Sequence, residues 1–142
     1  GNTTEVPVDH LLEEPVHLAL LLPMSGGWDG GRRIAGAAAL AVERVNADKA
    51  LLPGRRLEYN WADSGCSAQQ GLAAMGELLG RANTVDAVIG PACSATCEVT
   101  SYLSAGQRMP QISWGCASPE LSNKDKYPLV RLSHLVCLSH VL

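Results

Sequence analysis

A glycine-rich turn that carries a tryptophan is the part of this sequence best suited to bind a ligand. The segment Leu22–Trp28 closes an apolar run that begins at Val16, and Asp29-Gly30-Gly31 follows it. A strand, a glycine turn and an amphipathic helix form the arrangement by which an α/β sheet presents a binding loop at the carboxyl ends of its strands. The Trp28 ring can stack on a ligand or cover its own turn, and physics alone does not separate these two roles.

The other polar and aromatic residues suit a binding site better than a catalytic centre. The run Gly90–Ser94 resembles a nucleophile turn, but it lacks the G-x-S-x-G spacing and no His–Asp pair is positioned behind it. The run Gly26–Gly31 lacks the Lys-Ser/Thr of a phosphate loop and the G-x-G-x-x-G of a dinucleotide turn. A structural or solvated role is the better interpretation of the four histidines, His10, His17, His134 and His140. We therefore expect no enzyme and no cofactor, and a site for a small polar ligand.

The cysteines do not have the spacing of a zinc site, so we expect no metal. The sequence contains Cys66, Cys93, Cys97, Cys116 and Cys137. Only Cys93 and Cys97 lie close together, and that pair is too isolated to hold zinc. An odd number in a secreted protein leaves one thiol over, or pairs it with a partner outside the chain. The sequon at Asn2 is a candidate glycosylation site and fits a secretory route, although composition alone leaves the localisation open.

Composition describes a globular domain and excludes several function classes. The chain has 142 residues, of which 46% are hydrophobic and 18% charged, which is enough to bury one core. Its net charge is −3 and its Lys and Arg residues are scattered, so we expect no nucleic acid partner. No apolar run reaches the ~18 residues of a spanning helix. The polar and acidic segment 1–14 is not a signal peptide.

Three helices are predicted from apolar residues at helical spacing. The first has a polar face that contains Asn46, and Pro53-Gly54 ends it; its apolar residues are Ile34, Ala37, Ala38, Ala41, Val42 and Val45. The second ends at Asn83-Thr84; its apolar residues are Ala68, Leu72, Met75, Leu79 and Ala82. The third fits Ser94–Gly106, with Val99 and Leu103 facing inward.

Strands alternate with these helices, which predicts a parallel, doubly wound α/β sheet. The expected strands are 16–22, 56–62, 85–89 and 111–113. Loops at their carboxyl ends gather on one edge, where open α/β sheets bind ligands. The loops concerned are Ser25–Trp28, Asp63–Ser67, Pro91–Ser94 and Trp114–Ser118.

Four segments of the sequence resemble a known receptor family. Four segments have the order and spacing seen in metabotropic GABA-B receptors: Leu22–Trp28, Asp63–Cys66, Gly90–Ser94 and Ser118–Asn123. More broadly, the chain resembles the ligand-binding region of class C G-protein-coupled receptors, natriuretic-peptide-type guanylyl cyclase receptors and periplasmic amino-acid-binding proteins. Residues 110–114 are also similar to the glutamate-receptor branch.

The resemblance implies an extracellular, two-lobed clamshell that holds ligand between its lobes and is tethered to a seven-helix membrane domain. We expect an N-terminal arm at 1–15, the first lobe of a periplasmic-binding-protein-like clamshell at 16–131, and an atypical tail at 132–142. The tail repeats Leu-Ser-His and stops where the family continues into a second lobe. We therefore expect a truncated or misspliced product, or a partial gene model, rather than a functional short isoform. Membrane attachment is expected only through a downstream domain.

The resemblance also assigns roles to individual residues. Trp28 corresponds to the tryptophan that stacks on the ligand, and Ser94 to the serine that grips its carboxylate. Gly27, Gly115 and Ser118 are expected to shape the pocket. A second serine of the pattern falls on Ala117, beside Ser118, which leaves GABA or a related amino acid, or a subunit that does not bind, as alternatives. Retention of Trp28 and Ser94 favours a competent site.

Cys66 and Cys93 occupy positions that the family joins by a disulfide, and both lie just beyond strand ends in neighbouring loops. The pairing of Cys97, Cys116 and Cys137 stays open. The resemblance further implies a second receptor subunit, in a heterodimer or homodimer. The alternative functions are a soluble periplasmic-type carrier and a guanylyl-cyclase-type ectodomain; a hydrolase-like enzyme is disfavoured by the missing acid–base partners.

Overall fold

A five-stranded parallel sheet organises the chain. The computed structural model describes residues 14–81 and 84–133. The strands follow the order β2-β1-β3-β4-β5 across the sheet, and every neighbouring pair is parallel. Their bounds are β1 Glu14–Leu22, β2 Arg55–Asp63, β3 Ala87–Ile89, β4 Gln111–Ser113 and β5 Val130–Leu132.

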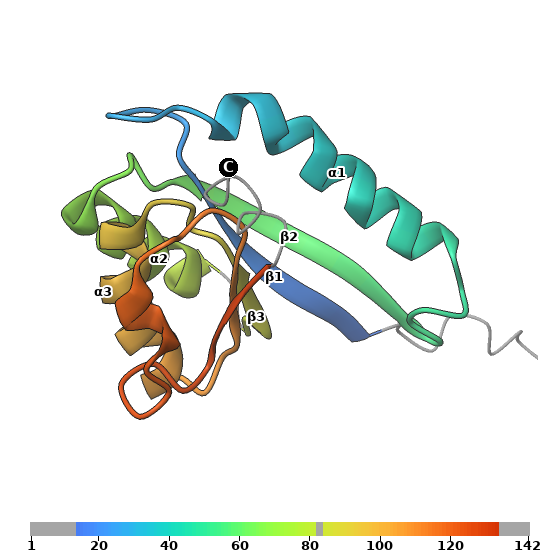
Figure 1. Ribbon diagram of the computed structural model, residues 1–142. Coiled ribbons are helices and arrows are strands. Elements are labelled where there is room, and N and C mark those ends of the chain that lie inside the picture. The colour runs from blue at the N-terminus through green and yellow to red at the C-terminus, as the bar shows by residue number, and fades with distance from the viewer. Residues whose placement is uncertain (1–13, 82–83, 134–142) are drawn as a thin grey trace, which may run out of the picture.

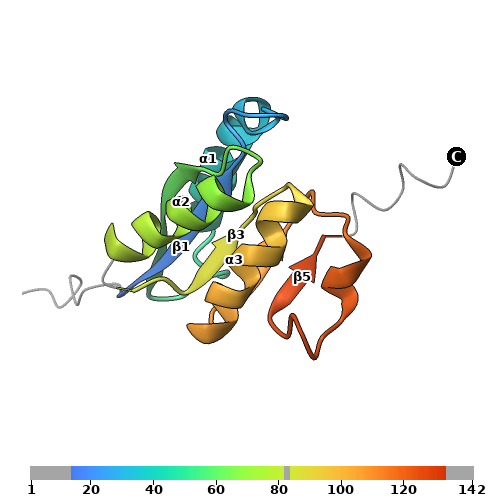
Figure 2. The ribbon, with the colours of Figure 1, turned by 90° about the vertical axis from the view of Figure 1, so that its left-hand side faces the viewer.

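Helices cover both faces of this sheet, which confirms the predicted doubly wound α/β fold. Helix α1 (Gly31–Ala47) packs over β1 and β2 on one face. Helices α2 (Ala68–Arg81) and α3 (Ser94–Gly106) pack against each other on the opposite face, as Figures 1 and 2 show. A short 3-10 helix, η1 (Pro119–Ser122), follows β4.

Two apolar clusters hold the layers together, and both lie on the face that carries α2 and α3. The larger one joins strands β1, β2 and β3 to α2, and it contains Ala19, Leu21, Ala62, Ala74, Met75, Leu78, Val88 and Met109. The smaller one joins α3 to β5 and the segment between β4 and β5; it contains Cys97, Cys116, Leu121, Tyr127 and Val130. Neither β5 nor η1 was predicted, because both are short and, unlike the equally short β4, neither directly follows a predicted helix.

The buried face of α2 differs from the predicted one. Met75 is fully buried as expected, but Leu72 is exposed and Leu79 only partly buried, while Gly71, Ala74 and Leu78 face the core. The cause is close packing of α2 on α3, since a Cβ on Gly71 would lie 2.0 Å from Cγ2 of Thr96. Small residues, rather than the largest apolar ones, therefore define this contact. The predicted apolar position Ala82 and the predicted helix end at Asn83 lie outside the described residues.

Helix α3 has the predicted bounds, but its inward face was predicted only in part. Val99 and Leu103 are only partly buried, although Leu103 does pack against the larger cluster. The buried residues are mostly hydroxyl-bearing: Thr96, Cys97, Thr100, Ser101 and Ser104. Three of these hydroxyls donate to carbonyls of their own helix, at 2.8 to 3.0 Å. Burial of the polar face is possible because those local bonds replace water.

Asn46 was predicted to lie on the solvent face of α1, and this prediction was wrong. Its side-chain amide donates to the Leu57 carbonyl at 2.9 Å and accepts from the Leu57 N–H at 2.7 Å. This pair of bonds fixes the end of α1 to the outer edge of β2. Strand ends differ from the predicted ones by one or two residues: β1 starts at Glu14, β2 runs from Arg55 to Asp63, and β3 starts at Ala87.

Candidate ligand-binding edge

Four loops follow the carboxyl ends of neighbouring strands and form what we call the loop edge. It consists of residues 23–30 after β1, 64–67 after β2, 90–93 after β3 and 114–118 after β4, together with the flanking residues Asp63, Ser94 and Ser113. Because the strands are parallel and adjacent in the sheet, these loops lie in one row although they are far apart in the sequence. Side-chain contacts then join each loop to the next.

Asp63, the last residue of β2, fastens the first two loops together. Its Oδ1 accepts from the backbone N–H of Met24 (2.8 Å), Ser25 (3.2 Å) and Gly65 (2.8 Å), and its Oδ2 accepts from the Ser25 hydroxyl (2.5 Å). Burial alone would raise the pKa of this carboxyl, but the Ser25 hydroxyl and the three N–H groups outweigh it, and the pKa is lowered. The loops approach so closely that a Cβ on Gly26 would lie 2.0 Å from the Gly65 carbonyl oxygen. Asp63 is thus the anchor of the loop that carries Trp28.

Two disulfides continue the row of contacts. Cys66 is bonded to Cys93, which joins the second loop to the third, and this is the pair that the resemblance implied. Cys97 is bonded to Cys116, which joins α3 to the fourth loop and settles a pairing that the sequence left open. The fifth cysteine, Cys137, lies outside the described residues.

Ser94 holds the fourth loop rather than capping its own helix. It is the first residue of α3, and the N-cap position belongs to Cys93, which makes no side-chain capping bond. The Ser94 hydroxyl oxygen accepts from the N–H of Ala117 and from the N–H of Ser118, both at 3.0 Å. Ser94 is therefore not the N-cap of α3. Two accepted bonds fill the oxygen's acceptor sites and leave its proton free for another partner.

Ser113 is a residue of this edge that the sequence did not reveal. Its buried side chain donates to the Pro91 carbonyl at 2.7 Å and accepts from the N–H of Cys116 at 3.1 Å. The third and fourth loops also touch directly, because a Cβ on Gly115 would lie 2.7 Å from the Ala92 Cβ. The sequence does not indicate which backbone N–H groups a serine at the end of a short strand will bind.

The rings of Trp28, in the first loop, and Trp114, in the fourth loop, lie close together. The Trp28 and Trp114 ring centroids are 5.7 Å apart with an angle of 46° between the planes. Trp28 also lies against its own turn, since a Cβ on Gly30 would be 2.3 Å from the Trp28 ring, and yet 47% of Trp28 is exposed. The ring therefore covers its turn and still presents an open face. Gly27 lies in the exposed part of that turn, with nothing near its Cβ position.

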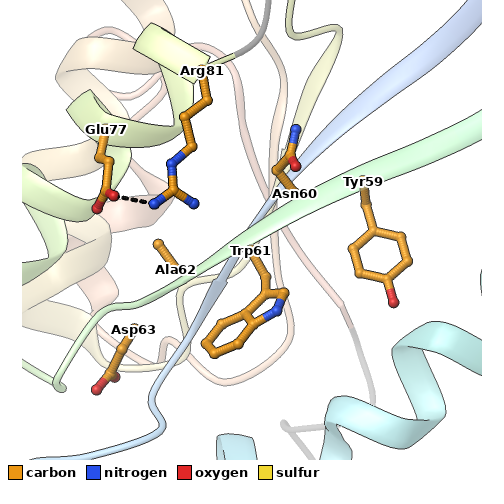
Figure 3. Close-up of a pocket in the computed structure, with 7 residues that line it drawn as sticks. All are labelled: Tyr59, Asn60, Trp61, Ala62, Asp63, Glu77 and Arg81. Atoms are coloured by element: carbon orange, nitrogen blue, oxygen red, sulfur yellow. Dashed lines mark hydrogen bonds and ion pairs between the residues drawn. The ribbon is translucent and has the colours of Figure 1, made fainter.

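A separate pocket of about 480 Å³ lies along the outer edge of β2. Figure 3 shows the Glu77–Arg81 pair of α2 on one side of this strand and Trp61 on the other. Asp63 belongs to the lining, but none of the residues that the sequence assigned to ligand binding does. We place the candidate site on the loop edge, because its hydroxyls and aromatic rings converge there, whereas the β2 pocket is a shallow hollow around a strand.

Other features of the sequence lie away from the loop edge. His17 is on β1, where its Nδ1 is 3.8 Å from the Glu58 carboxylate; the other three histidines lie outside the described residues, as does Asn2. Within residues 14–81 and 84–133, no group of three or more His, Cys, Asp and Glu side chains could hold a metal ion. In the same part of the chain, no helix is both long enough and apolar enough to cross a membrane.

Comparison with known proteins agrees with this architecture. The substrate-binding protein LivJ of a branched-chain amino acid transporter from Streptococcus pneumoniae, solved with isoleucine, superimposes with a TM-score of 0.72 at 20% identity. The match covers 84% of this chain and 33% of LivJ, and it shows the fold.

Two curated receptors are related in sequence. The mouse gamma-aminobutyric acid type B receptor subunit 1 is 30% identical over 125 residues, which cover 88% of this chain and 13% of the receptor. Rat guanylate cyclase 2D is 37% identical over 84 residues, which cover 59% of this chain and 7% of the cyclase. The chain thus spans only a small part of the relatives it matches. Residues 33–137 match the family described as the receptor family ligand binding region, and the chain belongs to this family.

Proposed function

We propose that this chain is the first lobe of the extracellular ligand-binding region of a GABA-B-like receptor, and that it recognises a small amino-acid-like ligand. The observation that carries the proposal is the pairing of two features on the loop edge: the half-exposed Trp28 ring and the Ser94 hydroxyl with its free proton. A flat apolar surface on the same sheet edge as a hydrogen-bond donor suits a ligand that has a short carbon chain and a carboxylate.

In this proposal Ser94 donates to the ligand carboxylate, and the first turn of α3 adds the favourable field of a helix N-terminus. Trp28 stacks on the carbon chain. Gly27, Gly115 and Ser118 shape the surroundings, and Gly115 does so by allowing the third and fourth loops to approach. Ala117 contributes its N–H to Ser94 and carries no hydroxyl, so the wall has one serine donor where the family pattern has two.

The remaining parts of the proposal concern the longer protein. They are a second lobe that closes the cleft, a downstream membrane domain, a second receptor subunit, a location on the extracellular face of the plasma membrane, and a glycan on Asn2. Similarity to the GABA-B receptor subunit and to the cyclase supports them as a family pattern. We infer a binding role and no enzymatic one, because the loop edge brings together hydroxyls and rings with no acid–base pair.

A soluble amino-acid carrier is the second candidate, and the structural similarity to LivJ favours it. The genomic sequence downstream of this chain separates the two candidates. A second lobe and then seven apolar spans support the receptor, whereas a stop codon after the second lobe supports the carrier.

The proposal predicts that Ser94→Ala weakens agonist binding by the full-length receptor about tenfold or more, because a charge-assisted hydrogen bond to carboxylate contributes roughly 1.5–3 kcal/mol. Folding stability should fall far less, since Ala117 and Ser118 remain held by the neighbouring disulfide at Cys116. Ser122→Ala, at an exposed position of η1, is the matched control. Equal agonist affinity in wild type, Ser94→Ala and Trp28→Ala receptors would exclude the assignment.

A further inference from the structure

Two serines that lie side by side on the loop edge have opposite hydrogen-bonding capacity. The Ser94 oxygen is filled by the N–H groups of Ala117 and Ser118, so this hydroxyl can only donate to a ligand. The Ser118 hydroxyl donates to Oε1 of Glu98 at 2.7 Å. An ionised carboxylate accepts only, so the shared proton is that of Ser118, and the Ser118 oxygen can only accept from a ligand. Ser118 therefore cannot supply the donor that is missing at Ala117.

Glu98 lies in a position to act on the same ligand. It is four residues after Ser94 on α3, which puts both side chains on one face of the helix. Residue 118 bonds to both of them, by its N–H to Ser94 and by its hydroxyl to Glu98. Among the residues that the structure describes, no Lys or Arg forms an ion pair with Glu98. Its negative charge is consequently left uncompensated next to the carboxylate-binding hydroxyl.

We infer that Glu98 determines the charge specificity of the site. Through Ser118 and through its own charge, it makes the surface next to Ser94 an acceptor for a cationic group. A ligand that carries an ammonium group as well as a carboxylate is then favoured, and a ligand with two carboxylates is disfavoured. The inference rests on the proposed function, because it requires that Ser94 receives the ligand carboxylate.

A purely structural role of Glu98 makes a different prediction. If the Ser118–Glu98 bond only held the fourth loop in place, its loss would weaken all carboxylate ligands to the same extent. A charge effect changes the preference between ligands of equal length and different charge. The ratio of two affinities therefore separates the two roles.

Three four-carbon molecules test the charge effect on the 142-residue chain. They are γ-aminobutyrate, with one ammonium and one carboxylate, butyrate, with one carboxylate, and succinate, with two. Titration at millimolar concentrations, followed by the ¹⁵N–¹H NMR signals of Ala117 and Ser118, measures each affinity. We expect the order γ-aminobutyrate, butyrate, succinate in the wild-type chain. A unit charge at contact distance in water changes binding by about fivefold, so the first and last should differ by at least that factor.

Glu98→Gln removes the charge and keeps an oxygen that can accept from Ser118. We expect it to reduce the preference for γ-aminobutyrate over butyrate by about fivefold, and the preference over succinate by about 25-fold, because the ammonium and the second carboxylate differ by two unit charges. Glu43→Gln, on the exposed side of α1, removes the same charge elsewhere and should leave the preference unchanged. An unchanged preference in Glu98→Gln, or an equal loss for all three molecules, would overturn the role of Glu98 alone. Absence of any response of Ala117 and Ser118 to the three molecules would overturn the proposed function as well.

Discussion

Short polar side chains at strand ends determine the shape of the loop edge, and they differ in how far the sequence revealed them. Ser94 and Trp28 were assigned from the family pattern, and the structure places both on the loop edge. The bonds of Asp63 and Ser113 were not predicted, because a polar residue after a strand is ordinary and its spacing does not indicate which amides it accepts. The sequence assigned candidate residues to the loop edge, whereas the hydrogen bonds within that edge depend on loop contacts that only the fold creates.

At the residue scale, Asp63→Asn should destabilise the chain by about 1–2 kcal/mol at pH 7, since bonds to a charged acceptor become bonds to a neutral one. The pKa of Asp63 is lowered in the folded state, so its charge stabilises the fold above the ordinary pKa of an aspartate and ceases to do so as the pH falls through the lowered value. The difference between wild type and Asp63→Asn in free energy of unfolding should therefore shrink below about pH 4. Denaturant unfolding at pH 7, 5 and 3 measures it.

The control for this experiment is Asp125→Asn, an exposed residue in the turn before β5, for which we expect little change at any of the three pH values. A difference between wild type and Asp63→Asn that stays constant from pH 7 to pH 3 would contradict the role given to the Asp63 charge.

At the scale of the elements, the bounds of helices and strands were predicted more accurately than the buried faces of the helices. The bounds of α3 and β4 were predicted correctly, because both belong to the regular alternation of helices and strands. The inward faces of α2 and α3 were predicted only in part, because both helices carry apolar or small residues on several sides. Their mutual contact selects Gly71 and Thr96, and side-chain hydrophobicity does not rank such residues as buried. Close packing of two helices depends on the size of the side chains between them, whereas the sequence pattern indicates only their polarity.

The elements around the loop edge are joined by Cys66–Cys93 and Cys97–Cys116, with sequence separations of 27 and 19 residues. Each bond should stabilise the chain by about 3–4 kcal/mol in the chain-entropy model. The double variant Cys97→Ser/Cys116→Ser should be destabilised more than Cys66→Ser/Cys93→Ser. Cys97 and Cys116 are buried in the smaller apolar cluster, so serine at these positions also loses packing. Peptide mapping of the secreted, alkylated and unreduced chain checks the pairing. Recovery of Cys66 and Cys93 in alkylated form would exclude the first bond.

At the scale of the whole molecule, the proposed function makes this chain one wall of a site. Helix α1 packs over β1 and β2. On β4, Ile112 alternates with the buried Gln111 and Ser113, so its side chain points to the sheet face that carries α1. Ile112 is 41% exposed, so α1 does not cover this part of the face. The fold class followed from the alternation of helices and strands. The family followed from four short segments that all fall on or beside the loop edge. The chain spans 13% of the GABA-B receptor subunit, and we propose that the opposite wall belongs to a second lobe.

The most direct test of the account is a titration of the soluble, monomeric 142-residue chain with γ-aminobutyrate, followed by NMR and calorimetry. A small ligand gains most of its affinity when about 70–90% of its surface is enclosed, and a single wall does not provide that. We predict millimolar affinity, with signal changes concentrated at Trp28, Ala117 and Ser118. Micromolar affinity for γ-aminobutyrate or glutamate, or signal changes confined to Tyr59 and Trp61 in the β2 pocket, would contradict the claim that the loop edge is one wall of an interlobe site.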